Sequence, residues 1–514
     1  MDYISLADTL LSGTSVFLTG SAGCGKTYLT TKTLEHLNQK SISIIRCGTT
    51  GVASLMHENG STLHSAFMLP VHDHPANLRQ WVVRVRNKMK SGHAKFERIR
   101  TAQIVLCDEI SMCSAYKLEL WDIECRIVRN CPTKPFGGLT LLLVGDFTQL
   151  PPVFKHDAKP RQHSRDGLYA FESPVWHKLN PKVVHLTQNY RQCDIGFAQI
   201  IYQLKQGVTL SESVRTLLRD KNQPPPESSM CVMIRAKSVN EYNKRRLHEL
   251  PSVLHSLPFP KRLVCDGDSK DIAYDLQREV EASLYLQYCE KFQLFRTGVR
   301  VMLIVNIKVG ELSYVNGDRG MIVGFSAPSS SALSVHVGAC SEDSGHCPVV
   351  LFERTKQLIL VSYHTFERKI EYAKIKHVAH LECIPLCLAE AYTVHKLQGA
   401  SVSCPLHIVC DGMESMSSTF YVALSRGTSL DNITLENFQN EGRINPKALC
   451  FYNGTYELPA KEHEVMKTIE AVVQEDSEFS PVVDYLRDTY KRSTAKRKFI
   501  EVVEKCMVEL ASSQ

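Results

Sequence analysis

Short apolar runs alternate with stretches of helical pattern along the first 190 residues of the chain. The runs lie at 16–19, 42–45, 104–107, 139–144 and 183–186. Their near-continuous apolar character is typical of strands that are buried on both faces of a parallel sheet. The pattern therefore predicts an α/β fold with helices on both faces of the sheet, in which ligands bind at the carboxyl ends of the strands.

The pattern changes between residues 292 and 380, where glycine and serine interrupt short β runs. Gly317, Gly320 and Gly324 lie among these runs, and residues 326–344 form a loop rich in serine. Short strands with such turn signals predict a small inserted β-barrel. The chain contains no run of about 18 apolar residues, so we expect no segment that spans a membrane.

Residues 20–27 read Gly-Ser-Ala-Gly-Cys-Gly-Lys-Thr and come directly after the first apolar run. This G-x-x-x-x-G-K-[ST] pattern is the phosphate-binding loop of proteins that use a nucleoside triphosphate with Mg²⁺. We expect Lys26 to reach the β- and γ-phosphates and the Thr27 hydroxyl to hold Mg²⁺. A chance glycine-rich turn is disfavoured, because a strand-like run precedes the loop and a helical pattern, whose N-terminus attracts anions, follows it. The predicted nucleotide-binding residues are Gly20, Ser21, Ala22, Gly23, Cys24, Gly25, Lys26 and Thr27.

Two carboxylates, Asp108 and Glu109, follow the apolar run 104–107. The end of a strand in a sheet that carries a phosphate-binding loop can serve the same nucleotide. We expect Asp108 to hold Mg²⁺, mostly through water, and Glu109 to orient and deprotonate the attacking water. The alternative is that both acids only cap the following helix.

The apolar run 139–144 leads into Gly-Asp-Phe-Thr-Gln-Leu-Pro-Pro-Val at 145–153. The two prolines forbid a helix and fix the direction of the chain. Gln149 is therefore expected on a stiff turn beside the strand end, where its amide can bond a γ-phosphate oxygen or water. The alternative is an ordinary β-turn without a catalytic role.

The net charge of the 514-residue chain is only +6, but its distribution is informative. The segment from Trp81 to Arg100 contains seven basic residues and one acidic residue, Glu97. These basic residues are Arg84, Arg86, Lys88, Lys90, Lys95, Arg98 and Arg100. With Trp81 and Phe96 among them, they are typical of a surface that follows a phosphate backbone, although a solvated helix face gives the same pattern.

Cysteine usage and the N-terminal sequence indicate the compartment. The 18 cysteines have no regular spacing, which indicates free thiols in a reducing environment. No basic residue precedes Lys26, which argues against a secretory signal and against an arginine-rich transit peptide. We therefore expect a protein that acts inside the cell, in the nucleus or cytoplasm, and is not secreted.

Several motifs follow one another in a defined order, including Pro-Phe-Gly-Gly at 135–138 and the segment 145–153. The others are Gly-Ser-Thr-Leu-His-Ser at 60–65, Phe-Glu-Ser at 171–173 with Trp176, Asn-Tyr-Arg-Gln at 189–192, Gly-Val-Arg-Val-Met at 298–302, Val-Asn-Gly-Asp-Arg-Gly at 315–320, Ala-Tyr-Thr-Val-His-Lys-Leu-Gln-Gly at 391–399 and Tyr-Val-Ala-Leu-Ser-Arg at 421–426. Together they closely resemble the PIF-type (petite integration frequency) DNA helicases of superfamily 1B, which are related to RecD. The resemblance covers roughly residues 14–430.

The resemblance implies an α/β fold with two RecA-like P-loop motor domains, a small inserted β-barrel domain and a wedge-like insertion. The predicted limits are 1–188 for the first motor domain, 70–100 for the basic wedge within it, 189–291 and 381–440 for the second motor domain, 292–380 for the barrel and 441–514 for a helical extension. The extension matches no motif of the family.

The resemblance also supplies residues that the pattern alone does not. Arg191 and Arg426 would act as arginine fingers that bring positive charge to the γ-phosphate. The predicted catalytic residues are thus Lys26, Asp108, Glu109, Gln149, Arg191 and Arg426, and the predicted DNA contacts are His64, Phe67, His395 and Lys396. The alternatives are a surface salt bridge for either arginine, a core position for Phe67 and an interior position for His395.

The chain departs from the family at three points. No glutamine precedes Gln39, whereas family members usually carry a glutamine motif that reads adenine just before the phosphate-binding loop. Cys24 stands where threonine is common. The long N-terminal extension of cellular family members is absent, and this compact form is similar to versions that large DNA viruses encode, which suggests a protein acting in an infected cell.

The sequence therefore predicts an ATP-dependent DNA helicase that requires Mg²⁺ and acts on single-stranded and forked DNA. By resemblance it would travel 5′ to 3′, translocate as a monomer, and work with replication or recombination proteins in DNA replication, repair, recombination or telomere maintenance. The alternatives are an RNA-directed helicase of the same superfamily, a non-enzymatic strand-binding subunit of a larger complex, and a RecD-like subunit of a nuclease complex.

Overall fold

The computed structural model describes most of residues 2–458. The longer gaps are 70–93, 153–168, 265–292 and 327–345, gaps of one to three residues occur elsewhere, and residues 459–514 lie outside the described part. The chain divides into two compact units. Unit 1 comprises Met1–Pro224, Leu397–Pro405 and Cys410–Gln514, and unit 2 comprises Pro225–Lys396 and Leu406–Val409.

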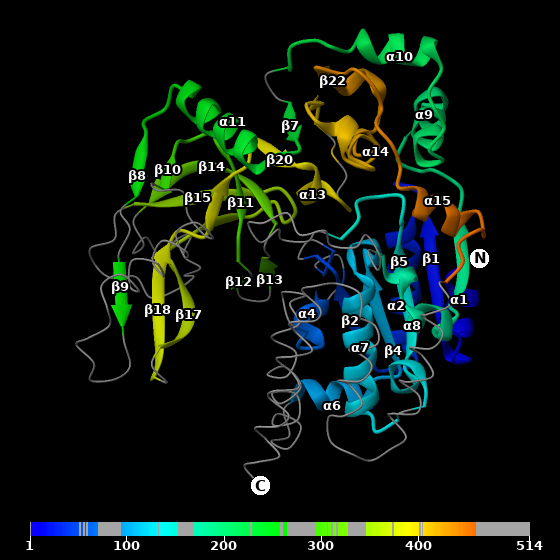
Figure 1. The fold of residues 1–514 in the computed structure, drawn as a ribbon. Coiled ribbons are helices and arrows are strands. Elements are labelled where there is room, and N and C mark those ends of the chain that lie inside the picture. Colours follow the sequence, from blue (N-terminus) through cyan, green and yellow to red (C-terminus); the bar gives the residue numbers. More distant parts are fainter. Residues whose placement is uncertain are drawn as a thin grey trace. The chain divides into compact units, whose positions relative to one another are not determined.

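A six-stranded sheet forms the centre of unit 1 (Figure 1). In spatial order its strands are β3 (Ser61–Thr62), β2 (Ile44–Gly48), β4 (Ile104–Asp108), β5 (Thr140–Gly145), β1 (Val16–Gly20) and β6 (Lys182–Leu186). Every neighbouring pair is parallel. The five apolar runs of the sequence correspond to β1, β2, β4, β5 and β6, so the predicted parallel sheet is confirmed.

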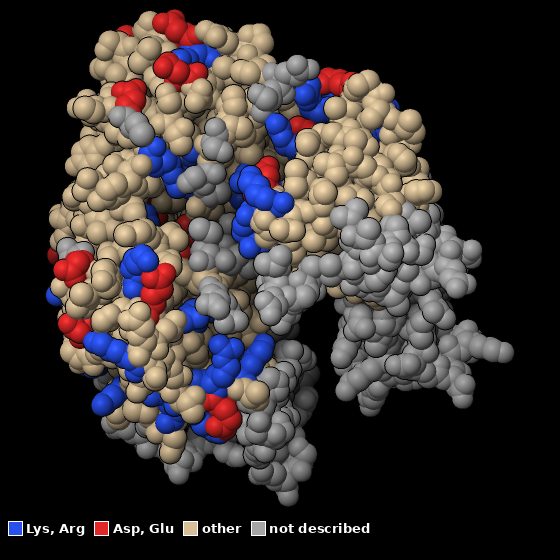
Figure 2. Space-filling view, turned by 180° about the vertical axis from the view of Figure 1, so that it is seen from behind, with Lys and Arg blue, Asp and Glu red and all other residues tan. Residues whose placement is uncertain are grey.

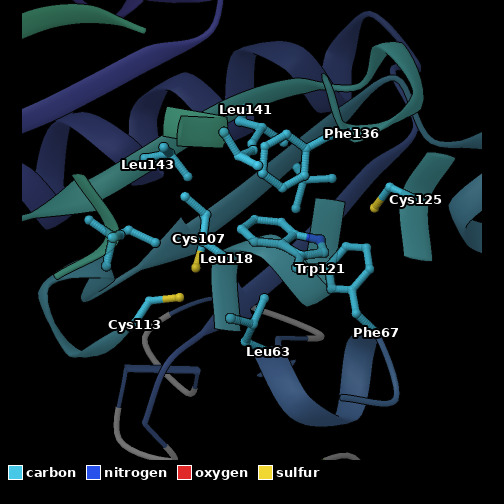
Figure 3. Close-up of a cluster of buried hydrophobic side chains, with 14 of the residues drawn as sticks. Leu63, Phe67, Cys107, Cys113, Leu118, Trp121, Cys125, Phe136, Leu141 and Leu143 are labelled. Atoms are coloured by element: carbon cyan, nitrogen blue, oxygen red, sulfur yellow. The ribbon is translucent and has the colours of Figure 1, made fainter. Parts of the chain in front are cut away.

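Helices cover both faces of this sheet, as the fully buried strands β1, β4 and β5 require. They are α1 (Tyr3–Leu11) and α2 (Lys26–Gln39) on one face and α7 (Ala115–Val128) on the other. The alternation along β5 divides the two cores, because Leu142 packs with α1 and α2, whereas Leu141 and Leu143 pack with α7. Figure 3 shows Trp121 of α7 at the centre of the second core, beside Phe67 and Phe136.

Local signals explain where α7 begins. Ser114 is its N-cap, and the Ser114 side chain accepts a hydrogen bond of 3.1 Å from the Lys117 backbone N–H. The other helices among the described residues of unit 1 are α4 (Leu63–Ala66), α6 (Ala94–Thr101), α8 (Pro174–Leu179), α9 (Ile195–Lys205), α10 (Glu212–Arg219), α14 (Thr419–Leu424) and α15 (Pro446–Tyr452). Short 3₁₀ turns lie at Ile110–Met112, Pro135–Gly138, Ala170–Glu172, Met413–Ser415 and Leu430–Asn432, and strand β22 at Ile433–Glu436.

Unit 2 contains a second set of parallel strands. Strand β7 (Met230–Met233) pairs in parallel with β20 (Ala391–Thr393) and with β21 (Leu406–Val409). Helix α11 (Ala236–Glu249) packs on these strands, since Val239 shares a core with Cys231, Ala391 and Val409. The single turn α13 (Val394–Leu397) follows β20 directly.

The rest of unit 2 is antiparallel. A five-stranded sheet has the order β16 (Leu358–Leu360), β15 (Cys347–Phe352), β14 (Arg319–Ser326), β11 (Arg300–Leu303) and β19 (Leu386–Leu388). Smaller sheets join β8 (His255–Leu257) to β10 (Gln293–Phe295), β12 (Ile307–Val309) to β13 (Leu312–Tyr314), and β17 (His364–Tyr372) to β18 (Ile375–Cys383) and β9 (Lys261–Val264). The predicted short strands are present, whereas their closure into a barrel stays a prediction.

The two compact units do not coincide with the predicted domain limits. Residues after 188 up to Pro224, and the segment from Cys410 onward, belong to unit 1 with the phosphate-binding loop. This division describes compactness and does not test the motor-domain limits, which stay a prediction. Most of the predicted wedge, 70–93, lies outside the described residues.

Two further features of the described residues bear on the sequence analysis. Each cysteine that the structure describes carries a free thiol. Among the helices described, none combines the length and the apolar character needed to cross a membrane.

Candidate functional site

The phosphate-binding loop joins the end of β1 to the first turn of α2. Gly23 has a φ of +82°, and a Cβ at this position would lie 2.4 Å from the Cβ of Arg191, so only glycine fits. The Lys26 Nζ donates hydrogen bonds to the backbone oxygens of Gly20 (2.8 Å) and Ser21 (2.9 Å). The lysine is therefore folded over the loop, at the position from which it can bind phosphate oxygens.

Asp108 ends β4 in the same sheet, and its carboxylate is held from two sides. One oxygen accepts a hydrogen bond of 2.8 Å from the Glu109 backbone N–H. The other lies 3.1 Å from Nε2 of His57, whose side chain is buried. His57 is a residue that the sequence analysis missed, because nothing in its local pattern distinguishes it from an ordinary core histidine.

Glu109 adopts the left-handed backbone conformation, with a φ of +54°. Its backbone oxygen accepts a hydrogen bond of 2.6 Å from the Thr49 hydroxyl, and its side chain accepts one of 3.0 Å from the Gln398 amide. Burial raises the pKa of the Glu109 carboxyl, and the charge of Asp108 raises it further, while Gln398, Lys26 and Arg426 act in the opposite direction. A carboxyl with a raised pKa, beside the phosphate-binding loop, is well suited to accept a proton.

Gln149 and Asp146 lie in the turn after β5. Gln149 is buried, and its Oε1 has no hydrogen-bond partner among the residues that the structure describes. Asp146 is buried too, and it accepts hydrogen bonds from the backbone N–H and the hydroxyl of Thr148. Burial by itself would raise the pKa of Asp146, but Lys205, Lys26 and Thr148 together hold it below its usual value. Asp146 is therefore a buried carboxylate that stays charged and holds the turn after β5 through Thr148.

Two tyrosines connect Asp146 to distant parts of the chain. The hydroxyl of Tyr421 donates to an Asp146 oxygen over 3.2 Å and accepts from the Ala22 backbone N–H over 3.5 Å. The hydroxyl of Tyr452 lies 3.3 Å from the other Asp146 oxygen. Neither tyrosine was predicted as a site residue, although Tyr421 lies within a motif that the sequence analysis identified.

The two candidate arginine fingers meet at Ser425. Arg191 donates a hydrogen bond of 3.0 Å to the Ser425 backbone oxygen, and Arg426 donates one of 2.9 Å to the Ser425 hydroxyl. Burial lowers the pKa of Arg191 to about 9, with a contribution from the positive charge of Arg426. Burial lowers the pKa of Arg426 too, while Glu109 counteracts this effect. Both arginines lie in unit 1, which also contains Glu109.

The residues predicted to contact DNA lie in both compact units. His64 lies on α4 in unit 1 and is partly buried. His395 and Lys396 lie on α13 in unit 2, where burial lowers the pKa of His395 and Lys396 is exposed. Phe67 is fully buried, with its ring 5.0 Å from that of Trp121, which favours the core interpretation of this residue.

The basic cluster is described only in part, since 84–90 lie outside the described residues. Lys95 donates to the Ser65 backbone oxygen, and Arg100 pairs with Glu97. Figure 2, which shows the side opposite to that of Figure 1, has Lys and Arg side chains in several small groups, with Asp and Glu side chains among them. Both interpretations of the cluster, a phosphate-following surface and a solvated helix face, therefore stay open.

Known protein families and solved structures resemble this chain. Residues 2–213 match a family model described as PIF1-like helicase. The chain is similar to the PIF-type helicases. The predicted resemblance is thus confirmed, and the matched segment contains the phosphate-binding loop, both acids and Gln149.

Curated relatives extend the similarity beyond this segment. The human ATP-dependent DNA helicase PIF1 is 29% identical over 86% of this chain and 62% of its own length. The Pif1 of Bdellovibrio bacteriovorus is 27% identical over 87% of this chain and 90% of its own length. The chain spans 48% of the Trypanosoma brucei brucei relative PIF7, so it covers less than two thirds of several of these proteins.

Solved structures share the fold. The Pif1 helicase of Candida albicans has a TM-score of 0.70 at 23% identity, over 88% of this chain and 98% of its own. The Bacteroides Pif1 in complex with ADP-AlF3 and ssDNA has a TM-score of 0.64 at 22% identity, over 90% and 98%. The predicted α/β fold class with parallel sheets is confirmed, while the barrel and the wedge stay predictions.

Proposed function

We propose that this chain is an ATP-dependent DNA helicase. The observation that carries the proposal is electrostatic: Lys26 of the phosphate-binding loop and Arg426, which is distant in the sequence, both lower the pKa of the half-buried Glu109. A phosphate-binding lysine, a general base and an arginine finger are the groups that hydrolysis of a γ-phosphate needs. The relatives named above as ATP-dependent DNA helicases support the same conclusion.

The proposed chemistry assigns one role to each group. Lys26 and the loop N–H groups bind the phosphates, and Gln149 bonds the γ-phosphate or the attacking water. Glu109 takes a proton from this water. The water oxygen forms a bond to the γ-phosphorus while the bond between the γ-phosphorus and the leaving ADP oxygen breaks. Arg191 and Arg426 stabilise the charge that develops on the phosphoryl oxygens.

The residues present fit a Mg²⁺ ion. The Thr27 hydroxyl and the Asp108 carboxylate are hard oxygen donors, which Mg²⁺ prefers, and a carboxylate has about four lone-pair sites. The described bonds of Asp108 to His57 and to the Glu109 N–H use one site on each oxygen, so capacity for an ion or its waters remains. When bound, Mg²⁺ would neutralise phosphate charge.

The strand-binding part of the proposal rests on His64, His395 and Lys396. Solved relatives are described as bound to ssDNA and as unwinding forked dsDNA, which supports single-stranded and forked DNA as the substrates. Travel from 5′ to 3′, action as a monomer inside the cell, and a place in replication, repair, recombination or telomere maintenance belong to the same proposal. The same proposal includes contacts between the DNA strand and the basic residues near Lys95.

The deciding experiment is unwinding of forked duplexes that carry a single 5′ or a single 3′ overhang. We expect unwinding that depends on ATP and Mg²⁺ and on the 5′ overhang, with a Glu109→Gln variant inactive. Unwinding of neither substrate, together with no ATP hydrolysis, would identify a non-enzymatic strand-binding protein. ATP hydrolysis that single-stranded RNA stimulates more than single-stranded DNA does would favour the RNA-directed alternative.

A further inference from the structure

The side chain of Gln398 holds the carboxylate of Glu109. Gln398 is buried, and its amide nitrogen donates to Glu109 Oε2 over 3.0 Å and to the Ser111 hydroxyl over 3.1 Å. Both hydrogens of the amide are therefore used. The Oε1 of the same amide is buried without a hydrogen-bond partner among the described residues. A buried amide oxygen without a hydrogen-bond partner is an exception in folded proteins and needs an explanation.

The backbone next to Gln398 encloses the same carboxylate. Gly399 has a φ of +84°, and a Cβ at this position would lie 3.1 Å from Glu109 Oε1. On its other side Glu109 is fixed by the Thr49 hydroxyl and by its own left-handed conformation. The carboxylate is thus held between a hydrogen-bond donor and a closely approaching backbone.

This hydrogen bond opposes the role that we propose for Glu109. A donor on the carboxylate occupies a lone pair that a general base needs for the proton of water. Removal of the donor would leave the carboxylate free to turn toward an attacking water.

The position of Gln398 in the chain links this hydrogen bond to the strand contacts. Lys396 is the last residue of the long unit 2 segment, and Leu397 begins the short segment that belongs to unit 1. Only Leu397 separates Lys396 from Gln398, and α13 is a single turn, Val394–Leu397. A nucleic-acid strand that displaces α13 would act on Gln398 through two peptide bonds.

We propose that Gln398 restrains Glu109 while no strand is bound, and that a single strand at His395 and Lys396 withdraws Gln398 and so stimulates hydrolysis. This inference rests on the proposed helicase function. It makes Gln398 a positioning residue, because it acts through Glu109. It predicts that the stimulation of ATP hydrolysis by single-stranded DNA depends on one amide N–H.

The test is Gln398→Met, which keeps the length of the side chain and removes the donor. We expect the kcat of ATP hydrolysis without DNA to rise on the order of tenfold, as for loss of a hydrogen bond to a charged group. The KM for ATP and the kcat at saturating single-stranded DNA should stay close to those of the unaltered protein. The matched control is Gln203→Met on an exposed position of α9, which should change neither rate.

The outcomes separate this inference from the proposed function. If the unaltered protein hydrolyses no ATP with or without DNA, the helicase proposal fails. If it is stimulated by DNA and Gln398→Met is stimulated by the same factor, only the restraint is overturned. A parallel loss of both rates, with unchanged binding of a fluorescent ADP analogue, would show that Gln398 orients Glu109 productively, and this result also contradicts the restraint.

Discussion

The hydroxyl of Tyr452 lies 2.7 Å from the hydroxyl of Thr19, although 433 positions of the chain separate the two residues. Thr19 belongs to β1, the strand that leads into the phosphate-binding loop, and Tyr452 ends α15. The same Tyr452 oxygen accepts a hydrogen bond of 3.0 Å from the Phe147 backbone N–H. Figure 1 shows α15, in orange, beside β1. A segment without any recognised motif thus helps to hold two strand ends of the nucleotide site.

We predict that Tyr452→Phe lowers the free energy of unfolding by about 1–3 kcal/mol, because Asp146, Thr19 and the Phe147 N–H lose a buried partner. The ring contacts with Phe451 are retained, so the loss reports the hydroxyl alone. Urea denaturation measures the change. Tyr202→Phe, at an exposed position of α9, is the control. Equal stability of the Tyr452 and Tyr202 variants would show that the hydroxyl network contributes nothing.

Substitution of Lys26 tests the phosphate-binding loop. Lys26→Ala removes a charged donor that lies over the loop, and loss of such a hydrogen bond costs about 1.5–3 kcal/mol. We therefore expect the Kd for ATP to rise about 10- to 100-fold, measured by displacement of a fluorescent nucleotide. Because the lysine also contributes to the low pKa of Asp146, thermal unfolding should be recorded in parallel. Unaltered ATP affinity in a folded variant would remove Lys26 from the site.

Glu109→Gln should separate binding from turnover. The amide keeps the shape of the side chain but cannot accept the proton of water, and general-base catalysis contributes about 10²–10⁴ in rate. We expect the kcat of ATP hydrolysis to fall by this factor while the affinities for ATP and for single-stranded DNA are retained. Phosphate release under single-turnover conditions measures the loss. A kcat equal to that of the unaltered protein would assign the proton transfer to another group.

The sequence was sufficient for those parts of the fold and site that local patterns encode. The apolar runs predicted five of the six strands of the unit 1 sheet, and the loop motif placed Lys26 at the start of α2. Strand β3, only two residues long, has no such signal.

The contacts made by His57, Gln398 and Tyr452 could not be predicted, because each reaches its partner through tertiary structure. His57 bonds Asp108 across 51 positions, and Gln398 bonds Glu109 across 289 positions. Hydrophobic periodicity carries information on elements, whereas these bonds depend on how elements pack.

Arg426 is the residue whose substitution should affect catalysis most. Arg426→Lys keeps a positive charge but loses the planar fork that can bind two phosphoryl oxygens. If Arg426 acts as a finger, hydrolysis should fall by up to about 10³–10⁵ while ATP binding is retained. The parallel variant Arg191→Lys should show a loss of its own, since both side chains meet at Ser425. If Arg426→Lys retained normal hydrolysis, Arg426 would not be an arginine finger, and its role would be structural, through its hydrogen bonds with Val422 and Ser425.

Phe67 provides a test between a core role and a strand-binding role. Its ring is fully buried against Trp121, and such an aromatic pair contributes about 0.5–1.5 kcal/mol beyond the burial of its area. We predict that Phe67→Leu lowers the free energy of unfolding by at least this amount and leaves the Kd for single-stranded DNA unchanged, as fluorescence anisotropy would report. Tyr202→Leu, an exposed aromatic position, controls for loss of a ring. Loss of a stacked base would instead cost about 1–3 kcal/mol of binding. A weakened DNA affinity with normal stability would therefore show that Phe67 leaves the core to meet the strand.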